Sequence, residues 1–222
     1  MRAKKISKHR LLFICLGLLL LLAAAACLAV LEWRGNTNVL ESVGVTEVKP
    51  PIGTEIDNFN GVAVYYNGPI DNVSGRSVAS DGYNLGQQYQ CVEFVKRYYY
   101  EFMGHKMPDP WGHAKSFYDP SITDGGFNKA RGLKQYANGG GTKPEVNDIL
   151  VFGSTGYGHV AIICEVGPGY VEMIQQNPGP YAPSRERLPL TSKTVSYEDD
   201  GRMLSHTAWK IGGRGPSGWL RK

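Results

Sequence analysis

Hydrophobic positions recur at helical spacing in one segment of the chain, which begins at Cys91. The apolar and aromatic residues that follow it at intervals of 3, 4, 7, 8 and 11 are Phe94, Val95, Tyr98, Tyr99 and Phe102. These intervals mark one face of an α-helix, and Gly104 is a natural stop signal. Glu93 and Arg97 stand four residues apart in acid-then-base order, which is typical of an exposed helix surface. The pattern therefore predicts a helix that opens at Cys91.

Short β-rich runs bounded by glycine, proline and asparagine predict several strands. They cover residues 61–68, 148–152, 159–166, 170–176 and 207–211, with a further segment at 218–222. The three central runs are separated only by "GSTGYG" and "GPG", so we predict an antiparallel meander. Residues 107–144 are rich in glycine and proline, and an irregular segment of this length is usually functional or mobile. A helix followed by gathered strands indicates an α+β domain.

The first residues of the chain have a different pattern, a basic head followed by an apolar run. The head contains Arg2, Lys4, Lys5, Lys8 and Arg10. The run Leu11–Leu31 carries no charge, and a helix of about 20 such residues crosses a bilayer. Basic residues stay on the cytoplasmic side, so we expect a single-pass, membrane-anchored protein with its domain outside the cytoplasm. The alternatives are a cleaved signal or a lipoprotein signal, because small residues precede Cys27.

This division gives three parts: residues 1–34 as head and anchor or signal segment, residues 35–51 as a linker ending in two prolines, and residues 52–222 as the domain. Residues 1–34 hold six of the 24 basic residues and one of the 20 acidic residues, so the remainder carries 18 basic and 19 acidic residues. A domain with that balance has no basic field for nucleic acid. We therefore expect no nucleic-acid partner.

Cys91 has two interpretations at the start of the predicted helix. It is either the first buried residue of the apolar face or a nucleophile, because the free N–H groups of a helix N-terminus favour a thiolate and can also stabilise an oxyanion. An isolated cysteine at this spacing is more often a core residue. The pattern around Cys91 alone favours the core, and only a partner base would favour the nucleophile instead.

His159 is the candidate base. It follows a glycine turn and begins the apolar strand "GHVAIICEV". We expect the strand to fix the direction of the His159 side chain and to leave it open to a cleft, as a general base requires. Strand alternation puts Cys164 on the other face from His159, so we interpret Cys164 as a core residue and expect no disulfide between Cys91 and Cys164. In the next strand Gln175 and Asn177 share one face, and either one is a candidate to orient the imidazole.

Three blocks, "YQCVEFVKRYY", "GHVAII" and "IQQN", together resemble the CHAP family of cysteine- and histidine-dependent amidohydrolases and peptidases. The resemblance extends over residues 52–220 and is strongest to the amidase domain of glutathionylspermidine synthetase/amidase. It implies a papain-like fold of the CHAP/NlpC type, with the nucleophile Cys91 on a helix packed against an antiparallel sheet, and His159 as base. The family commonly has glutamate where this chain has Gln175, while Asn177 matches the family asparagine.

The resemblance and the outward orientation together predict an extracytoplasmic thiol amidohydrolase or peptidase that acts through an acyl-enzyme on Cys91. The expected partner is a peptide or small-amide substrate, with a cell-wall peptide of peptidoglycan as the first candidate. The alternatives are an amidase for a small glutathionylspermidine-like amide, and a binding module weakened by Gln175. We expect no cofactor and no metal: Asp81 lies where some relatives carry calcium ligands, but one carboxylate is not a site.

Overall fold

The computed structural model describes residues 49–154 and 156–222. The regular structure of these residues consists of one α-helix, α2 (Cys91–Glu101), one short 3₁₀-helix, η1 (Ala114–Phe117), and twelve strands. Residues 50–222 form one compact unit. The mixed α+β class is confirmed, and a papain-like fold stays a prediction. Within the described residues no helix is long and apolar enough to span a membrane, and the predicted span Leu11–Leu31 lies outside them.

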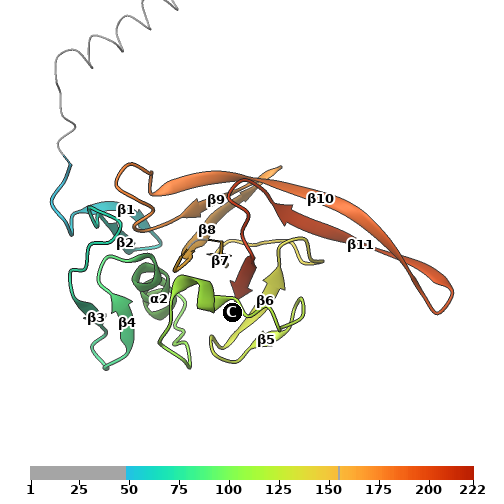
Figure 1. Cartoon of the computed structure of the whole chain (residues 1–222), viewed down its shortest axis with the longest axis horizontal. Coiled ribbons are helices and arrows are strands. Elements are labelled where there is room, and N and C mark those ends of the chain that lie inside the picture. The colour runs from blue at the N-terminus through green and yellow to red at the C-terminus, as the bar shows by residue number, and fades with distance from the viewer. Residues whose placement is uncertain (1–48, 155) are drawn as a thin grey trace, which may run out of the picture. The chain divides into compact units, whose positions relative to one another are not determined.

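Eight strands form the main sheet, in the order β11-β10-β9-β8-β7-β12-β6-β5 (Figure 1). Their bounds are β5 (Phe127–Asn128), β6 (Leu133–Ala137), β7 (Ile149–Phe152), β8 (His159–Gly167), β9 (Tyr170–Ile174), β10 (Arg185–Asp199), β11 (Arg202–Ile211) and β12 (Gly218–Arg221). All pairs in this sheet are antiparallel. The predicted meander of three central strands is therefore confirmed as β7, β8 and β9.

Two small hairpins complete the structure: β1 (Glu55–Phe59) with β2 (Val62–Tyr65), and β3 (Arg76–Val78) with β4 (Asn84–Gln87). The segment expected to be irregular between residues 107 and 144 contains η1, β5 and β6. Leu133, Gln135 and Tyr136 of β6 are buried, and this strand pairs with β12. The pairing partner lies about 80 residues away in sequence, which explains why local pattern did not reveal the strand.

The core lies on both faces of the sheet. On one face Val160 and Ile162 pack with Phe94, Val95 and other residues of α2. On the other face a second cluster contains Ala161, Ile163, Met173 and Trp219. Alternation along β8 supplies both clusters, since successive side chains of a strand point to opposite faces. The helix is therefore held against the sheet with its N-terminus at the end of β8 where His159 lies.

The helix is buried more completely than its pattern predicts. Glu93 and Arg97, expected on an exposed surface, are 2% and 8% exposed, and they form an ion pair of 2.7 Å. The reason is that α2 contacts β2 and β4 as well as β8, so no broad face is left to solvent. A buried pair of this kind is tolerated only when its remaining polar atoms are satisfied.

Candidate active site

Cys91 is the first residue of α2 and is half-buried. The backbone N–H groups of Val160, Val92 and Cys91 itself act electrostatically on its thiol. Burial raises the pKa of the thiol, and these N–H groups act in the opposite direction. At neutral pH Cys91 is therefore a protonated thiol, surrounded by donors that would stabilise a negative charge at the same place.

His159 begins β8 and is 8% exposed. Its Nε2 lies 2.9 Å from Oε1 of Gln175, and its ring centroid lies 6.1 Å from that of Phe152, its partner across the strands. Burial lowers the pKa of His159 to about 4, with the positive charge of Arg214 acting in the same direction and the bond to Gln175 acting against both. The imidazole is therefore neutral at rest.

Two neighbours fix the orientation of the Gln175 amide. Its Nε2 donates to the carbonyl oxygen of Pro183 at 3.1 Å, and its Oε1 accepts from Nη1 of Arg214 at 3.3 Å. Because a carbonyl can only accept and a guanidinium can only donate, the amide oxygen must face His159. Nε2 of His159 then carries the hydrogen, which leaves the lone pair on Nδ1. An imidazole in this tautomer is prepared to accept a proton at Nδ1.

Asn177, the second candidate for orienting His159, contacts other groups. Its Nδ2 donates to the carbonyl oxygen of Ile70 at 2.8 Å and to Oε1 of Gln90 at 2.7 Å. Its Oδ1 is buried and has no hydrogen-bond partner in the described part of the chain. Of the two candidates, Gln175 is therefore the one that contacts the imidazole, while Asn177 holds the residue that precedes Cys91.

Gln176, which the sequence analysis did not single out, connects the helix to the end of β9. Its Nε2 donates to Oε2 of Glu93 at 2.8 Å and to the carbonyl oxygen of Gln90 at 3.0 Å. Its Oε1 accepts from the backbone N–H of Tyr65 at 2.8 Å. The three consecutive residues of "QQN" thus contact different groups. Gln175 contacts the candidate base, Gln176 contacts the buried ion pair of α2, and Asn177 contacts the residue before Cys91.

Arg214 was also missed, because it lies in the glycine-rich segment between β11 and β12 and belongs to no motif. Its Nη1 lies 3.2 Å from Oε2 of Glu186 as well as 3.3 Å from Gln175. Its guanidinium stacks 5.1 Å over the ring of Phe152. A positive charge therefore stands beside the amide that holds the candidate base.

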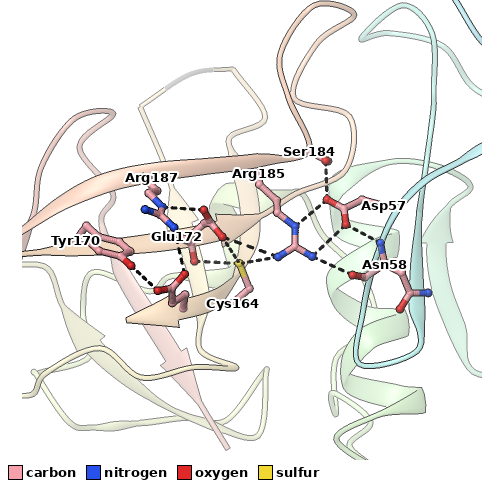
Figure 2. A network of polar contacts seen from close by, with 9 residues as sticks. Asp57, Asn58, Cys164, Tyr170, Glu172, Ser184, Arg185 and Arg187 are labelled. Carbon is pink, nitrogen blue, oxygen red and sulfur yellow. Dashed lines mark hydrogen bonds and ion pairs between the residues drawn. The ribbon is translucent and has the colours of Figure 1, made fainter. Parts of the chain in front are cut away.

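A second polar network, shown in Figure 2, lies at the start of β10. Arg185 donates to both carboxylate oxygens of Asp57 on β1, at 2.9 and 3.0 Å, and Ser184 donates to the same carboxylate at 2.7 Å. Burial acts to raise the pKa of Asp57, but the hydrogen bonds from Arg185 and Ser184 lower it below its usual value. The network ties residues 177–184, the loop after Gln175, to the β1–β2 hairpin.

Cys164 lies in this network (Figure 2), where its sulfur donates to the carbonyl oxygen of Glu172 at 3.3 Å. Burial raises the pKa of its thiol to about 11. Cys164 and Cys91 are both free, which confirms that no disulfide joins them. The geometric reason differs from the one expected, because both cysteines pack against the same core cluster. Cys91 contributes to that cluster from the start of α2, and Cys164 contributes from β8.

A small pocket opens between the β2 end and the loop that follows β9. Its lining includes Tyr65, Tyr66, Asn67, Asn177 and Pro178. Within residues 49–154 and 156–222 no cluster of three or more His, Cys, Asp or Glu side chains is arranged to hold a metal ion. Asp81 accepts from the backbone N–H of Tyr83 and pairs with Lys106.

Comparison with known proteins gives one family match. Residues 80–177 match the family model of the CHAP domain, a range that includes Cys91, His159, Gln175 and Asn177. This stretch therefore matches the CHAP domain, as the three sequence blocks predicted. Arg214 and the β10–β11 hairpin lie outside the matched range.

Two curated proteins of Crithidia fasciculata are similar to the chain. Trypanothione synthetase is 32% identical over 107 residues, which are 47% of this chain and 16% of that protein. Glutathionylspermidine synthase is 30% identical over 121 residues, which are 50% of this chain and 16% of that protein. The chain thus matches about a sixth of the length of these relatives.

Proposed function

We propose that this chain is a cysteine amidohydrolase that cleaves an amide bond through an acyl-enzyme on Cys91. The observation that carries the proposal is the bond of 2.9 Å between His159 and Gln175, together with the backbone N–H of Val160, the residue after His159, which acts to lower the pKa of the Cys91 thiol. In the proposed site the Nδ1 lone pair of this fixed imidazole faces the thiol at the helix N-terminus, so that the two residues supply the base and the nucleophile of thiol catalysis.

In the proposed reaction the resting pair is neutral. Nδ1 of His159 takes the thiol proton as the sulfur of Cys91 attacks the carbonyl carbon, and the resulting oxyanion lies at the N–H groups of the helix tip. When the C–N bond breaks, the imidazolium returns the proton to the leaving amine. Water, deprotonated by the same imidazole, then hydrolyses the thioester and releases the acid and the free thiol.

Gln175 affects the energy of the imidazolium in this scheme. Its neutral amide orients the ring but stabilises the positive charge less than a carboxylate does, and Arg214 opposes that charge directly. The imidazolium is therefore a short-lived species in the proposed mechanism, and proton transfer accompanies attack on the carbonyl.

As the first candidate substrate we propose a cell-wall peptide, whose amide bond a membrane-anchored domain outside the cytoplasm would reach. This proposal rests on the basic head and the apolar run of residues 11–31, which give the expected orientation. The second candidate is a small amide of the glutathionylspermidine type, which rests on the names of the two relatives. The third candidate is a binding module that has lost turnover, and the replacement of the family glutamate by Gln175 is the feature that supports it.

The test compares the wild-type chain with Cys91→Ala on purified cell-wall material and on glutathionylspermidine, with released amine as the measurement. The proposal expects cleavage of one substrate by the wild type, loss of that cleavage in Cys91→Ala, and loss of labelling by iodoacetamide at Cys91. Cys164→Ala is the matched control and should keep full activity. Equal activity of wild type and Cys91→Ala would contradict the proposal, and binding without turnover would favour the third candidate.

A further inference from the structure

The β10–β11 hairpin extends beyond the rest of the main sheet (Figure 1). β10 pairs with β9 only from Arg185 to Pro189, whereas its pairs with β11 continue to Asp199. Residues 191–210 are therefore a two-stranded ribbon, about 30 Å long at 3.3 Å per residue. A ribbon of two strands is only marginally stable by itself, so we expect another surface to stabilise a ribbon of this length.

The two faces of this ribbon differ in chemistry. Residues directly opposite in an antiparallel pair share a face, so the register separates the side chains into two sets. One face carries the pairs Lys193–Ala208, Val195–His206, Tyr197–Leu204 and Asp199–Arg202. The opposite face carries Ser192–Trp209, Thr194–Thr207, Ser196–Ser205 and Glu198–Met203. The first set, here called the arm face, is apolar in its middle, whereas the middle of the opposite face consists of serine and threonine.

The apolar middle of the arm face remains accessible to solvent. Val195 is 37% exposed, Tyr197 is 46% exposed and Leu204 is 40% exposed, and Tyr197 meets the edge of the His206 ring at 5.8 Å between centroids. An antiparallel sheet with one apolar and one polar face normally packs its apolar face against another layer. In the described part of the chain no other strand pairs with the ribbon beyond Pro189.

Charges along the arm face indicate what covers it. Lys193 stands at the base of the arm and Asp199 at its tip, three residues on either side of Ser196. Rotation by 180° about an axis that crosses the strands at the Ser196–Ser205 pair places Lys193 opposite Asp199 of a second copy, and Val195 opposite Tyr197. The same rotation brings Leu204 opposite His206, and Arg202 opposite Ala208. The face is therefore complementary to itself in charge at Lys193 and Asp199, and in apolar character at Val195 and Tyr197.

We propose that the arm face is a self-association surface, on which two copies of this chain pack their β10–β11 ribbons face to face and antiparallel. An anionic membrane does not suit this surface as well, because the tip carries three acidic residues, Glu198, Asp199 and Asp200, and one basic residue, Arg202. The ribbon of each copy gains the second layer that its apolar face lacks, and the arrangement closes as a dimer because each copy uses the same patch.

Charge reversal provides a specific test. Within one chain Lys193 and Asp199 are six residues apart on one strand, about 20 Å, so they cannot pair with each other. Lys193→Asp and Asp199→Lys should each create like-charge contacts twice per dimer and weaken association at least tenfold, the equivalent of about 1.4 kcal/mol. The double reversal Lys193→Asp/Asp199→Lys should restore the two-chain mass. Only a contact between copies predicts that rescue.

The measurement is sedimentation velocity of the full chain in a non-ionic detergent over a range of micromolar concentrations. Tyr197→Ser should lower the mass towards one chain, and Ser196→Asp, its neighbour on the opposite face, should not. Circular dichroism of every variant checks that the fold is kept. A single-chain wild type, failure of the double reversal to restore association, or equal effects of Tyr197→Ser and Ser196→Asp would each overturn the proposal. A monomer whose cleavage of wall material falls in Tyr197→Ser would assign the face to substrate instead.

Discussion

Nε2 of His159 donates to Oε1 of Gln175 across 2.9 Å, in a site where the neighbouring thiol is protonated and the imidazole is neutral. A carboxylate at position 175 would hold the same ring and also attract its positive charge. An amide gives orientation without that attraction. The first three predictions follow from this difference, and a fourth concerns the network of Figure 2.

Gln175→Glu should raise the pKa of His159 above the value of about 4 that burial imposes. A larger share of the site then exists as thiolate and imidazolium, so alkylation of Cys91 by iodoacetamide at pH 6 should become about tenfold faster, in line with one pKa unit of stabilisation. The rate of alkylation as a function of pH is the measurement. An unchanged pH profile would mean that Arg214 neutralises the new carboxylate.

Arg214→Met should also raise the pKa of His159, because the positive charge that opposes the imidazolium is removed. The same change removes the 3.3 Å donor to Gln175, so kcat should fall several-fold while the acid limb of the pH profile moves to higher pH. A titration of the His159 ring protons by NMR separates the two effects. Arg187→Met is the matched control, since Arg187 pairs with Glu165 and Glu172 at the surface; an equal shift in that variant would contradict a role for Arg214.

The free energy of unfolding should depend on pH through His159. Its pKa is lowered from 6.5 to about 4 in the folded state, so the unfolded chain binds a proton more readily at intermediate pH. The contribution of neutral His159 to the free energy of unfolding is complete above about pH 6.5. As the pH falls towards 4, this free energy decreases by up to about 3 kcal/mol. Urea unfolding at a series of pH values measures this slope. His159→Gln should flatten it, and an equally steep slope in that variant would assign the effect to other groups.

Asp57→Asn should loosen residues 177–184 by weakening the paired hydrogen bonds from Arg185. Because the Arg185 side chain is 38% exposed, solvent reduces the effect to about 1 kcal/mol of unfolding free energy. In limited proteolysis, the protease should cut this loop faster in Asp57→Asn than in the wild type. The urea midpoint alone would not show that the change is confined to the loop. Asp81→Asn, in an exposed pair with Lys106, is the control. Equal cutting of the wild type and Asp57→Asn would show that the network does not order the loop.

Much of the site was predictable because its parts are local patterns. The 3.6-residue period places Cys91 at the start of α2, and the two-residue alternation of β8 and β9 places His159 and Gln175 on one face of the sheet. The three blocks then identify the CHAP domain. Each of these signals lies within a few consecutive residues, where periodicity reports directly on which side chains share a face.

Other features depend on contacts that no local window contains. The pair Glu93–Arg97 has the spacing of a surface pair and is buried only because β2 and β4 cover the helix. Arg214 reaches Gln175 from a segment without any motif. The whole of β10 was missed because Pro189 and a run of polar residues interrupt its strand pattern, although the pairing with β11 continues from Leu190 to Asp199.

The position of β12 in the sheet has a consequence for how the protein is made. β12 lies between β7 and β6, although it follows β7 by more than 60 residues in sequence. During synthesis β6 and β7 emerge early and have no direct pairing with each other, so the two parts of the sheet stay separate until Gly218–Arg221 leave the ribosome. The exposed edges of β6 and β7 are then the surfaces at which nascent chains would aggregate, and a chaperone that binds extended apolar segments would act there.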